Sequence, residues 1–375
     1  LAHILVNELQ EMGVKNARVD DKCYVYASIP ATPGYEDSKV LGFISHMDTV
    51  SDFEDHMVQP IVHDNYDGKA LQPGERGRTL DVSLFPHLPS LKGRTLITSD
   101  GTTILGADDK AGVAAIMCMA ERVLNSDMPH GKICIGFTPD EEVGGGADHF
   151  DVKGFGADFA YTVDGGAESE IEYENFNAVR ADVDFKGFNI HPGSAKNTMI
   201  NAALVAMEFN NMLPAGETPR DTDGYEGFYH LTRMSGNVEK ANLNYILRDH
   251  DADNIARRQE IMKEIAKKLN EKYGAGTVNL TLKEEYRNMA EKIRENFHLI
   301  ENAKKAVKKS GVEPQVVPVR GGTDGARLSF MGLPCPNLGT GSYACHGPYE
   351  HATAEGMDIV VDTLTELVRL YGEMK

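Results

Sequence analysis

Residues 104–146 read ILGADDKAGVAAIMCMAERVLNSDMPHGKICIGFTPDEEVGGG. The first part indicates the end of a strand, a loop with Asp108 and Asp109, and a helix. The second part indicates another strand and a loop with Glu141 and Glu142, followed by three glycines. Open α/β sheets bind their ligands at the carboxyl ends of strands, where these carboxylates are expected. One interpretation is that both acidic loops are simply solvated. The other is a metal site, because a helix joins the two loops.

Apolar residues mark one face of the helix that follows the first acidic loop. They recur at helical spacing at Val113, Ile116, Met117, Ala120, Val123 and Leu124, as expected for one buried helix face. Asp108 or Asp109 then stands at the helix N-terminus, where free amide groups and the macrodipole favour a carboxylate. An N-cap role explains one of the two aspartates and leaves the other for a different function.

An apolar run at residues 39–46 ends in His46 and is followed by Asp48. Such a run is typical of a buried strand in a parallel or mixed sheet. Because the two residues are two apart, their side chains leave an extended segment on the same face. The Asp48 carboxylate can therefore hold one imidazole nitrogen of His46 while the other nitrogen binds a metal. A capped strand end with a turn is the alternative.

Two further apolar runs lead to acidic residues in the same way. Residues 132–138 precede Glu141 and Glu142, and residues 159–163 precede Asp164. The groups that follow four strand-like runs are thus His46, Asp108, Glu142 and Asp164. Four such groups at four strand ends favour a common site over coincidence.

The sequence pattern changes after residue 174. Residues 179–186 alternate polar and apolar side chains, as expected for a strand with one solvated face. Strand and helix patterns then alternate up to residue 287. We therefore predict an α/β fold in which a mixed central sheet flanked by helices is formed by residues 1–174 and 288–375. Residues 175–287 are predicted to form an inserted α+β domain.

The bulk composition excludes some classes of partner. The net charge is −19 over 375 residues, which argues against nucleic acid or an anionic membrane, because both bind clustered lysine and arginine. No apolar run approaches the roughly 18 residues that span a bilayer. Five cysteines without a CxxC pair indicate reduced thiols and a cytoplasmic protein. The chain opens on a helical stripe without an initiator methionine, so we expect that a preceding segment is missing.

The candidate metal ligands are His46, Asp108, Glu142, Asp164 and His346. Imidazole and carboxylate groups without thiolates suit zinc, with cobalt or manganese as alternatives, in a catalytic site. Five ligands are too many for one tetrahedral ion with an open position, and they suit two ions that share a bridging carboxylate. Asp108, from the central loop, is the expected bridge. Glu141 is the expected general base, which takes a proton and passes it to the leaving amine.

A covalent nucleophile is the alternative chemistry, and the sequence does not favour it. No serine lies in a GxSxG motif, and Cys345, beside His346, lacks a convincing orienting partner. Cys345 as an additional metal ligand is an alternative that the sequence leaves open.

The motifs taken together resemble those of a known enzyme family. They are HMD at 46–48, LGADDKAG at 105–112, TPDEEVG at 138–144, TVDGG at 162–166, RGGTDG at 320–325 and HG at 346–347. GYEGFYH at 224–230 adds a match within the inserted segment. They are similar to motifs of the dinuclear-zinc aminopeptidases related to carboxypeptidase G and the aminoacylases, over essentially the whole chain. The resemblance implies a metal-dependent aminopeptidase that hydrolyses the N-terminal peptide bond of short peptides, tripeptides above all.

The resemblance also implies roles for individual residues. His46, Asp108 and Asp164 would hold one zinc ion, and Asp108, Glu142 and His346 would hold the other. Glu141 would be the general base and Asp48 would orient His46. The peptide bond between Asp108 and Asp109 would be cis.

The inserted domain would, by the same resemblance, be a lid that carries substrate contacts. His191 would stabilise the tetrahedral oxyanion, and Arg248 would contact the substrate. Arg320 would bind the terminal carboxylate of the peptide, for which a bidentate guanidinium is suited. Taken by themselves, Arg248 and Arg320 indicate surface ion pairs, and His191 indicates a turn.

Two other functions remain as alternatives. A dipeptidase or an N-acyl-amino-acid deacylase would use the same metal pair, because that pair hydrolyses many amides. A non-catalytic peptide-binding protein would be expected to have lost Glu141 or one of the ligands, and none is lost. We expect a short peptide as the partner, and the sequence leaves a homodimer open.

Overall fold

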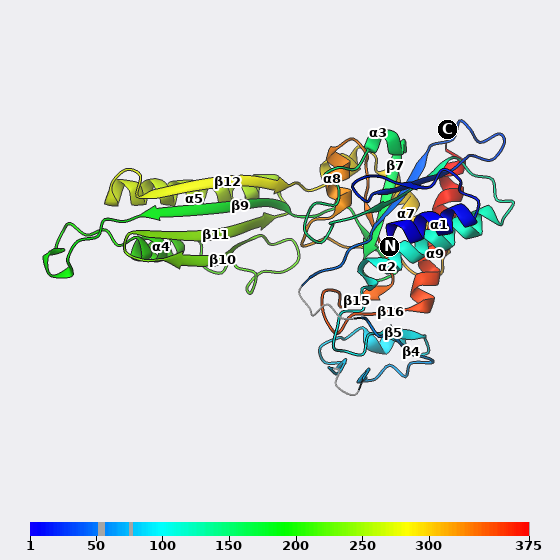
Figure 1. Cartoon of the computed structure of the whole chain (residues 1–375), viewed down its shortest axis with the longest axis horizontal. Coiled ribbons are helices and arrows are strands. Elements are labelled where there is room, and N and C mark those ends of the chain that lie inside the picture. Colours follow the sequence, from blue (N-terminus) through cyan, green and yellow to red (C-terminus); the bar gives the residue numbers. More distant parts are fainter. Residues whose placement is uncertain (52–56, 75–77, 375) are drawn as a thin grey trace. The chain divides into compact units, whose positions relative to one another are not determined.

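The computed structural model describes residues 1–51, 57–74 and 78–374 (Figure 1). The chain divides into two compact units. The first unit comprises Leu1–Tyr173, Met289–Val317 and Thr323–Lys375, and the second comprises Glu174–Asn288 and Pro318–Gly322. Among the described helices, none is both long and apolar enough to cross a membrane.

The first unit is built on a mixed sheet of eight strands. Their order is β1 (Arg18–Val19), β2 (Val25–Ile29), β6 (Ile133–Thr138), β3 (Leu41–His46), β7 (Phe159–Gly165), β14 (Asn337–Gly339), β8 (Glu170–Glu172) and β13 (Gln315–Val316). β3 pairs in parallel with β6 on one side and with β7 on the other. Their carboxyl ends therefore meet at one edge of the sheet, where His46 is paired with Thr138.

Helices cover both faces of this sheet. The helices of the first unit are α1 (Ala2–Glu11), α2 (Ala107–Leu124), α3 (Val152–Phe155), α6 (Ala290–Arg294), α7 (His298–Lys309), α8 (Asp324–Phe330) and α9 (Ala354–Gly372). Neighbouring residues of β3 point to opposite faces, so Phe43 joins the core that contains Ile116 of α2. Ile44 joins the second core, with Phe155 of α3 and Leu328 of α8. Apolar burial on both faces fixes the central position of β3.

A glycine brings the start of α2 against the sheet. A Cβ atom added at Gly112 would overlap the carbonyl oxygen of Val163 in β7 and the side chains of Asp109 and Ser45. Only a residue without a side chain allows this approach. The close contact places the first turn of α2 beside the carboxyl ends of β3 and β7.

A smaller antiparallel sheet lies in the same unit. Its strands are ordered β15 (Ser342–Tyr343), β16 (His351–Thr353), β5 (Leu96–Thr98) and β4 (Ile61–His63), and the short helix η1 (Leu88–Leu91) belongs to the same part of the chain. Tyr66, Leu80, Leu88 and Leu96 form a separate buried cluster here. This sheet anchors the loop that follows β15.

The second unit is an antiparallel sheet covered by two α-helices, α4 and α5 (Figure 1). Its strands are ordered β10 (Phe228–Gly236), β11 (Lys240–Asp249), β9 (Asn177–Lys186) and β12 (Val278–Tyr286); its helices are η2 (Pro192–Ser194), α4 (Ala202–Asn211) and α5 (Ala252–Tyr273). Alternate residues of β9 and β11 are buried with α4 and α5 in one core. Asn201 and Asp251 cap α4 and α5 by accepting backbone amides.

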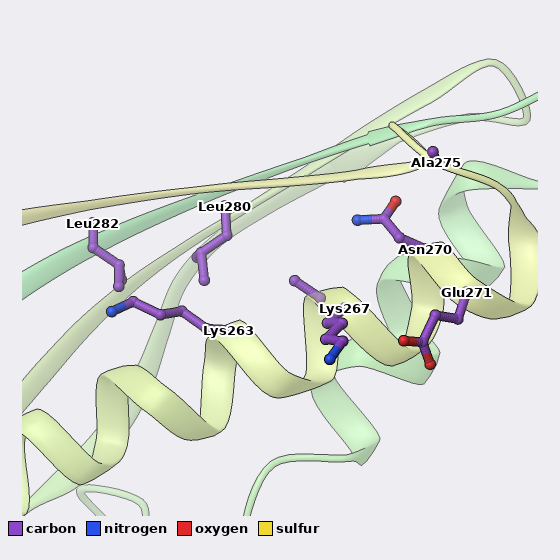
Figure 2. A pocket seen from close by; sticks show the side chains of 8 residues that line it. Lys263, Lys267, Asn270, Glu271, Ala275, Leu280 and Leu282 are labelled. Carbon is purple, nitrogen blue, oxygen red and sulfur yellow. The ribbon is translucent and has the colours of Figure 1, made fainter.

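A groove of about 750 Å³ runs between α5 and the edge strand β12 (Figure 2). Leu280 and Leu282 point from β12 toward α5, and Lys263 extends from the helix toward Leu282. The methylene stems of such lysines cover apolar surface while their ammonium groups stay in water. The groove in the second unit therefore has both apolar and charged side chains in its lining.

The predicted fold class is confirmed: a mixed central sheet and a separate antiparallel sheet are both present. Single elements are harder to predict than the fold class. Residues 289–309 read as one helix in the sequence but form α6 and α7, and residues 316–320 read as a strand but contribute only Val316 to β13. β10 was not predicted, and its mostly exposed residues explain the weak hydrophobic pattern.

Asp108 does not follow a strand, contrary to the pattern expected at residues 103–105. These residues are irregular and lead directly into α2. The reason is that the backbone amides here do not pair with a neighbouring strand. The amides of Leu105, Gly106 and Asp108 donate hydrogen bonds to the carboxylate of Glu350 instead. A local apolar run cannot reveal a partner that lies about 240 residues away.

Candidate metal centre

Three side chains from distant parts of the first unit meet at the carboxyl edge of the central sheet. The Asp108 carboxylate lies between two imidazoles, with its Oδ1 2.8 Å from Nε2 of His46 and its Oδ2 3.0 Å from Nε2 of His346. His46 ends β3, Asp108 lies at the start of α2, and His346 lies in the loop between β15 and β16. Asp108 therefore presents one oxygen to each histidine, as a bridging carboxylate does.

Each histidine also faces a second carboxylate. Oδ1 of Asp164 is 3.2 Å from Nε2 of His46, and Oε2 of Glu142 is 3.3 Å from Nε2 of His346. The structure thus brings together all five side chains that the sequence indicated as metal ligands. His46 is 2% exposed, whereas His346 is 53% exposed and lies on the solvent side of the cluster.

Asp48 holds two parts of this cluster at once. Its Oδ1 lies 3.3 Å from Nδ1 of His46, which leaves Nε2 of that ring directed at Asp108 and Asp164. The same carboxylate accepts the backbone amides of Glu141 at 3.0 Å and of Glu142 at 3.1 Å. Asp48 therefore orients the imidazole and also fixes the loop that carries both glutamates.

The two adjacent glutamates have different surroundings. The Glu142 carboxylate faces His346, while the Glu141 carboxylate has no hydrogen bond within the described part of the chain. Burial raises the pKa of Glu141 to about 9, with smaller contributions from the charges of Asp164 and Asp324. The raised pKa means that this carboxylate binds a proton more tightly than an exposed glutamate does, which suits a group that accepts a proton and later returns it.

Asp109 is the second aspartate of the central loop and has a structural role. Its Oδ1 accepts the amide of Gly112 at 3.2 Å, which caps the regular part of α2. Its Oδ2 accepts the Ser45 hydroxyl and the amide of His46. The side chain lies near His46 and Asp164, but its oxygens are already bonded to protein donors. The peptide bond between Asp108 and Asp109 is cis, as the resemblance implied.

The cluster carries more negative charge than its histidines balance. Burial acts to lower the pKa of His46, but the facing carboxylates of Asp164, Asp108 and Asp48 outweigh it and raise that pKa. A hydrogen bond to Asp108, followed by one to Glu142, raises the pKa of His346 to about 10. Burial also raises the pKa of Asp164 to about 6. The carboxylates therefore lack sufficient positive partners inside the protein.

Glu142 provides a more direct indication of a cation. Its Oε1 is buried and has no hydrogen-bond partner among the described residues. A buried charged oxygen is costly unless it is paired or binds a metal. The donor set is nitrogen and oxygen only, which zinc, cobalt and manganese accept. The residues present therefore fit divalent cations.

Comparison with known proteins agrees with this geometry. Residues 101–370 match the sequence pattern of peptidase family M20/M25/M40. The chain belongs to this family. It is 54% identical over 374 residues to peptidase T of Clostridium perfringens, with 100% of this chain and 92% of that protein covered.

Two crystal structures share the M20 fold. Aminopeptidase PepT of Bacillus cereus has a TM-score of 0.80 at 22% identity. The match covers 99% of this chain and 92% of the PepT chain. A dinuclear metal-binding M20 peptidase of Bacillus subtilis has a TM-score of 0.64 at 14% identity, covering 100% and 92%. The family match and the relative from Clostridium perfringens show that the chain is a metallopeptidase of the M20 family, and the two structures share its fold.

Three predicted substrate contacts of this M20 peptidase lie in the second unit. His191 is exposed and caps η2 by accepting the amide of Gly193. Arg248 lies 3.2 Å from Glu285 and stacks over the ring of Tyr286. The ion pair with Glu285 is what the sequence indicated for this arginine without the resemblance. Both side chains belong to the second unit, whereas Asp108 belongs to the first.

Arg320 is held by backbone carbonyls of the same unit. Its Nη1 donates to Gly224 and Glu226, and its Nη2 donates to Thr222. The guanidinium also lies over the ring of Phe176. A peptide carboxylate would therefore compete with carbonyl oxygens for this arginine, and a charged acceptor is the stronger of the two.

Sequence reasoning did not identify Asp324 as part of the M20 site. This side chain is 5% exposed and accepts the hydroxyl of Thr138 at the end of β6, at 2.8 Å. Burial raises its pKa to about 7, and the charge of Asp164 acts in the same direction. The acid in the RGGTDG motif was a signal that could have identified it.

Proposed function

We propose that this protein is a dinuclear metal aminopeptidase that releases the N-terminal residue of short peptides, tripeptides above all. One observation carries the proposal: Asp108 presents one carboxylate oxygen to each of two histidines, and each histidine faces a further carboxylate. Two cations that share Asp108 account for this symmetry, whereas one cation leaves a histidine and a carboxylate unused.

We propose zinc as the metal, with cobalt or manganese as alternatives that the same donors accept. His46, Asp108 and Asp164 would hold one ion, and Asp108, Glu142 and His346 would hold the other. A bound pair of this kind polarises a carbonyl group and lowers the pKa of water. Oε1 of Glu142, buried without a partner among the described residues, supports a ligand role for this side chain.

Glu141 would act as the general base and then as the general acid. Its carboxylate takes the proton of the attacking water and returns it to the nitrogen of the leaving amine, so the side chain is unchanged after each turnover. Burial raises the pKa of Glu141, so its carboxylate binds the transferred proton more tightly than an exposed glutamate does. The Asp48 carboxylate holds the Glu141 backbone and the His46 ring in place for both steps.

The second unit would act as a lid that selects the substrate by size. The relative named peptidase T and the structure named aminopeptidase PepT support N-terminal cleavage of peptides. His191, Arg248 and Arg320 are the proposed contacts, with His191 for the oxyanion and Arg320 for the terminal carboxylate. Charge-assisted hydrogen bonds to a carboxylate contribute more than neutral ones, so a clamp of this kind would discriminate between free and blocked peptides.

A tripeptide and two blocked forms test the proposal. We expect the free tripeptide to release its N-terminal residue, and the N-acetylated form to resist cleavage. The C-terminal amide should have a kcat/KM about 10- to 100-fold lower, because a charged hydrogen-bond pair is lost. Product release is measured by liquid chromatography.

Each other outcome has a defined meaning. Equal turnover of the amide would contradict the carboxylate clamp of Arg320 but leave the aminopeptidase intact. Cleavage of dipeptides or N-acyl amino acids in preference to tripeptides would replace the proposal with a dipeptidase or a deacylase.

A further inference from the structure

Glu350 is a buried carboxylate outside the set of predicted ligands. It lies four residues after His346 and is 2% exposed. Its Oε2 accepts the amides of Leu105 and Gly106, both at 2.7 Å, and its Oε1 accepts the amide of Asp108 at 2.9 Å. One side chain thus satisfies three backbone donors of the loop that carries Asp108.

This loop is irregular, so its amides need such a partner. Buried backbone N–H groups are almost always hydrogen-bonded. Burial raises the pKa of Glu350, and the amides of Asp108 and Gly106 act in the opposite direction. Three converging donors explain why a carboxylate with two acceptor oxygens, and not a hydroxyl or a single carbonyl, occupies this position.

Glu350 also belongs to the loop of the second histidine. Its backbone amide donates to the carbonyl oxygen of Gly347 at 3.0 Å, which closes the turn that follows His346. The carboxylate therefore ties the His346 loop to the Asp108 loop. Oδ2 of Asp108 and Nε2 of His346, 3.0 Å apart, lie on the two segments that it joins.

We propose that Glu350 is a positioning residue that sets the separation of Asp108 and His346, and thereby the affinity of the metal site that these two residues share. The inference rests on the proposed function. It assigns Glu350 no contact with metal or substrate. Groups that support metal ligands in this way commonly change metal affinity or activity about 10- to 100-fold when they are replaced.

The variants Glu350→Gln and Glu350→Ala test this role. Gln keeps one carbonyl oxygen for two of the three amides and sets its NH₂ group against another donor, whereas Ala leaves all three unpaired. We expect Glu350→Gln to weaken binding of the more weakly held zinc ion about 10- to 100-fold in a chelator competition. We expect kcat to fall at low zinc and recover in excess zinc, with KM changed less than about threefold. Glu350→Ala should show a larger loss of affinity.

Glu355→Gln is the matched control. Glu355 also accepts a backbone amide, that of Thr95, with both of its oxygens, but Thr95 precedes β5 and carries no ligand. We expect this variant to bind zinc within about twofold of the wild type. Thermal unfolding of the metal-free proteins reports whether each variant is folded, and Glu350→Gln carries the test if Glu350→Ala does not fold.

Two results would overturn the positioning role. One is wild-type zinc affinity in folded Glu350→Gln. The other is an equal loss of affinity in Glu350→Gln and Glu355→Gln, which would indicate general destabilisation. A wild-type protein that binds no zinc and cleaves no peptide would instead contradict the proposed function, so the two failures are distinguishable.

Discussion

Glu141→Gln is expected to lower kcat about 100- to 10,000-fold while the protein still binds two metal ions. The reason is that the Glu141 carboxylate bonds to no described residue, whereas its neighbour Glu142 faces His346. Gln has nearly the same shape but cannot take up the proton of the attacking water. Steady-state kinetics with a tripeptide, together with metal analysis of the same sample, measure both quantities.

Glu142→Gln is the control for this prediction. It makes the same substitution at the adjacent residue. It should weaken metal binding, because Oε2 of Glu142 lies 3.3 Å from the proposed ligand His346 and Oε1 is buried without a partner among the described residues. If Glu141→Gln lost metal and Glu142→Gln kept it, the roles of the two glutamates would be reversed. If Glu141→Gln kept full activity, the general base would have to be sought elsewhere.

Asp108→Ala is expected to remove both tightly bound ions. The kcat/KM should fall at least about 10,000-fold, which corresponds to about 5.5 kcal/mol of transition-state stabilisation. Each oxygen of Asp108 faces a different histidine, so one substitution affects both halves of the centre. The metal-free variant should unfold at a lower temperature than the metal-free wild type, because it loses the charge pairs of Asp108 with His46 and His346.

Asp164→Ala distinguishes a shared ligand from an ordinary one. Asp164 faces His46 alone, so this variant should lose one ion and keep the other on the side of His346. Isothermal titration with zinc counts the sites in both variants. Retention of one tightly bound ion by Asp108→Ala would show that Asp108 does not bridge.

Much of the fold could be predicted from local sequence patterns. The apolar runs that became β3, β6 and β7 are buried on both faces, and their hydrophobicity is continuous for that reason. His46 and Asp164 stand at or near the ends of such runs, so the parallel pairing of neighbouring strands brings them together. Such patterns report burial, because the type of each residue, apolar or polar, reflects whether its side chain is buried.

Other features depend on contacts that leave no local pattern. The loop before Asp108 was expected as a strand because Ile104 and Leu105 are apolar, but the carboxylate of Glu350 takes its amides. The guanidinium of Arg320 is likewise held by carbonyls about 95 residues earlier in the chain. Neither partner could be found without the three-dimensional structure, since the spacing between them carries no signal.

The ligand cluster illustrates both cases. The residue types were readable because imidazole and carboxylate groups after apolar runs are uncommon without a function. The sequence did not show which of Asp108 and Asp109 is the metal ligand and which caps the helix, because an N-cap role suits either residue. Three donors around Asp109 decide it: the Ser45 hydroxyl and two backbone amides occupy its oxygens. Asp108 instead places one oxygen within 3.0 Å of each histidine.

Titration of the metal-free protein with zinc, followed by tripeptide cleavage at each addition, tests the dinuclear centre most directly. The arrangement of Asp108 between His46 and His346 predicts no activity without metal and saturation of binding at two ions per chain. Activity should fall again when a chelator is added in excess. Full cleavage by protein that contains no metal, or saturation at one ion per chain in the wild type, would contradict a dinuclear site bridged by Asp108.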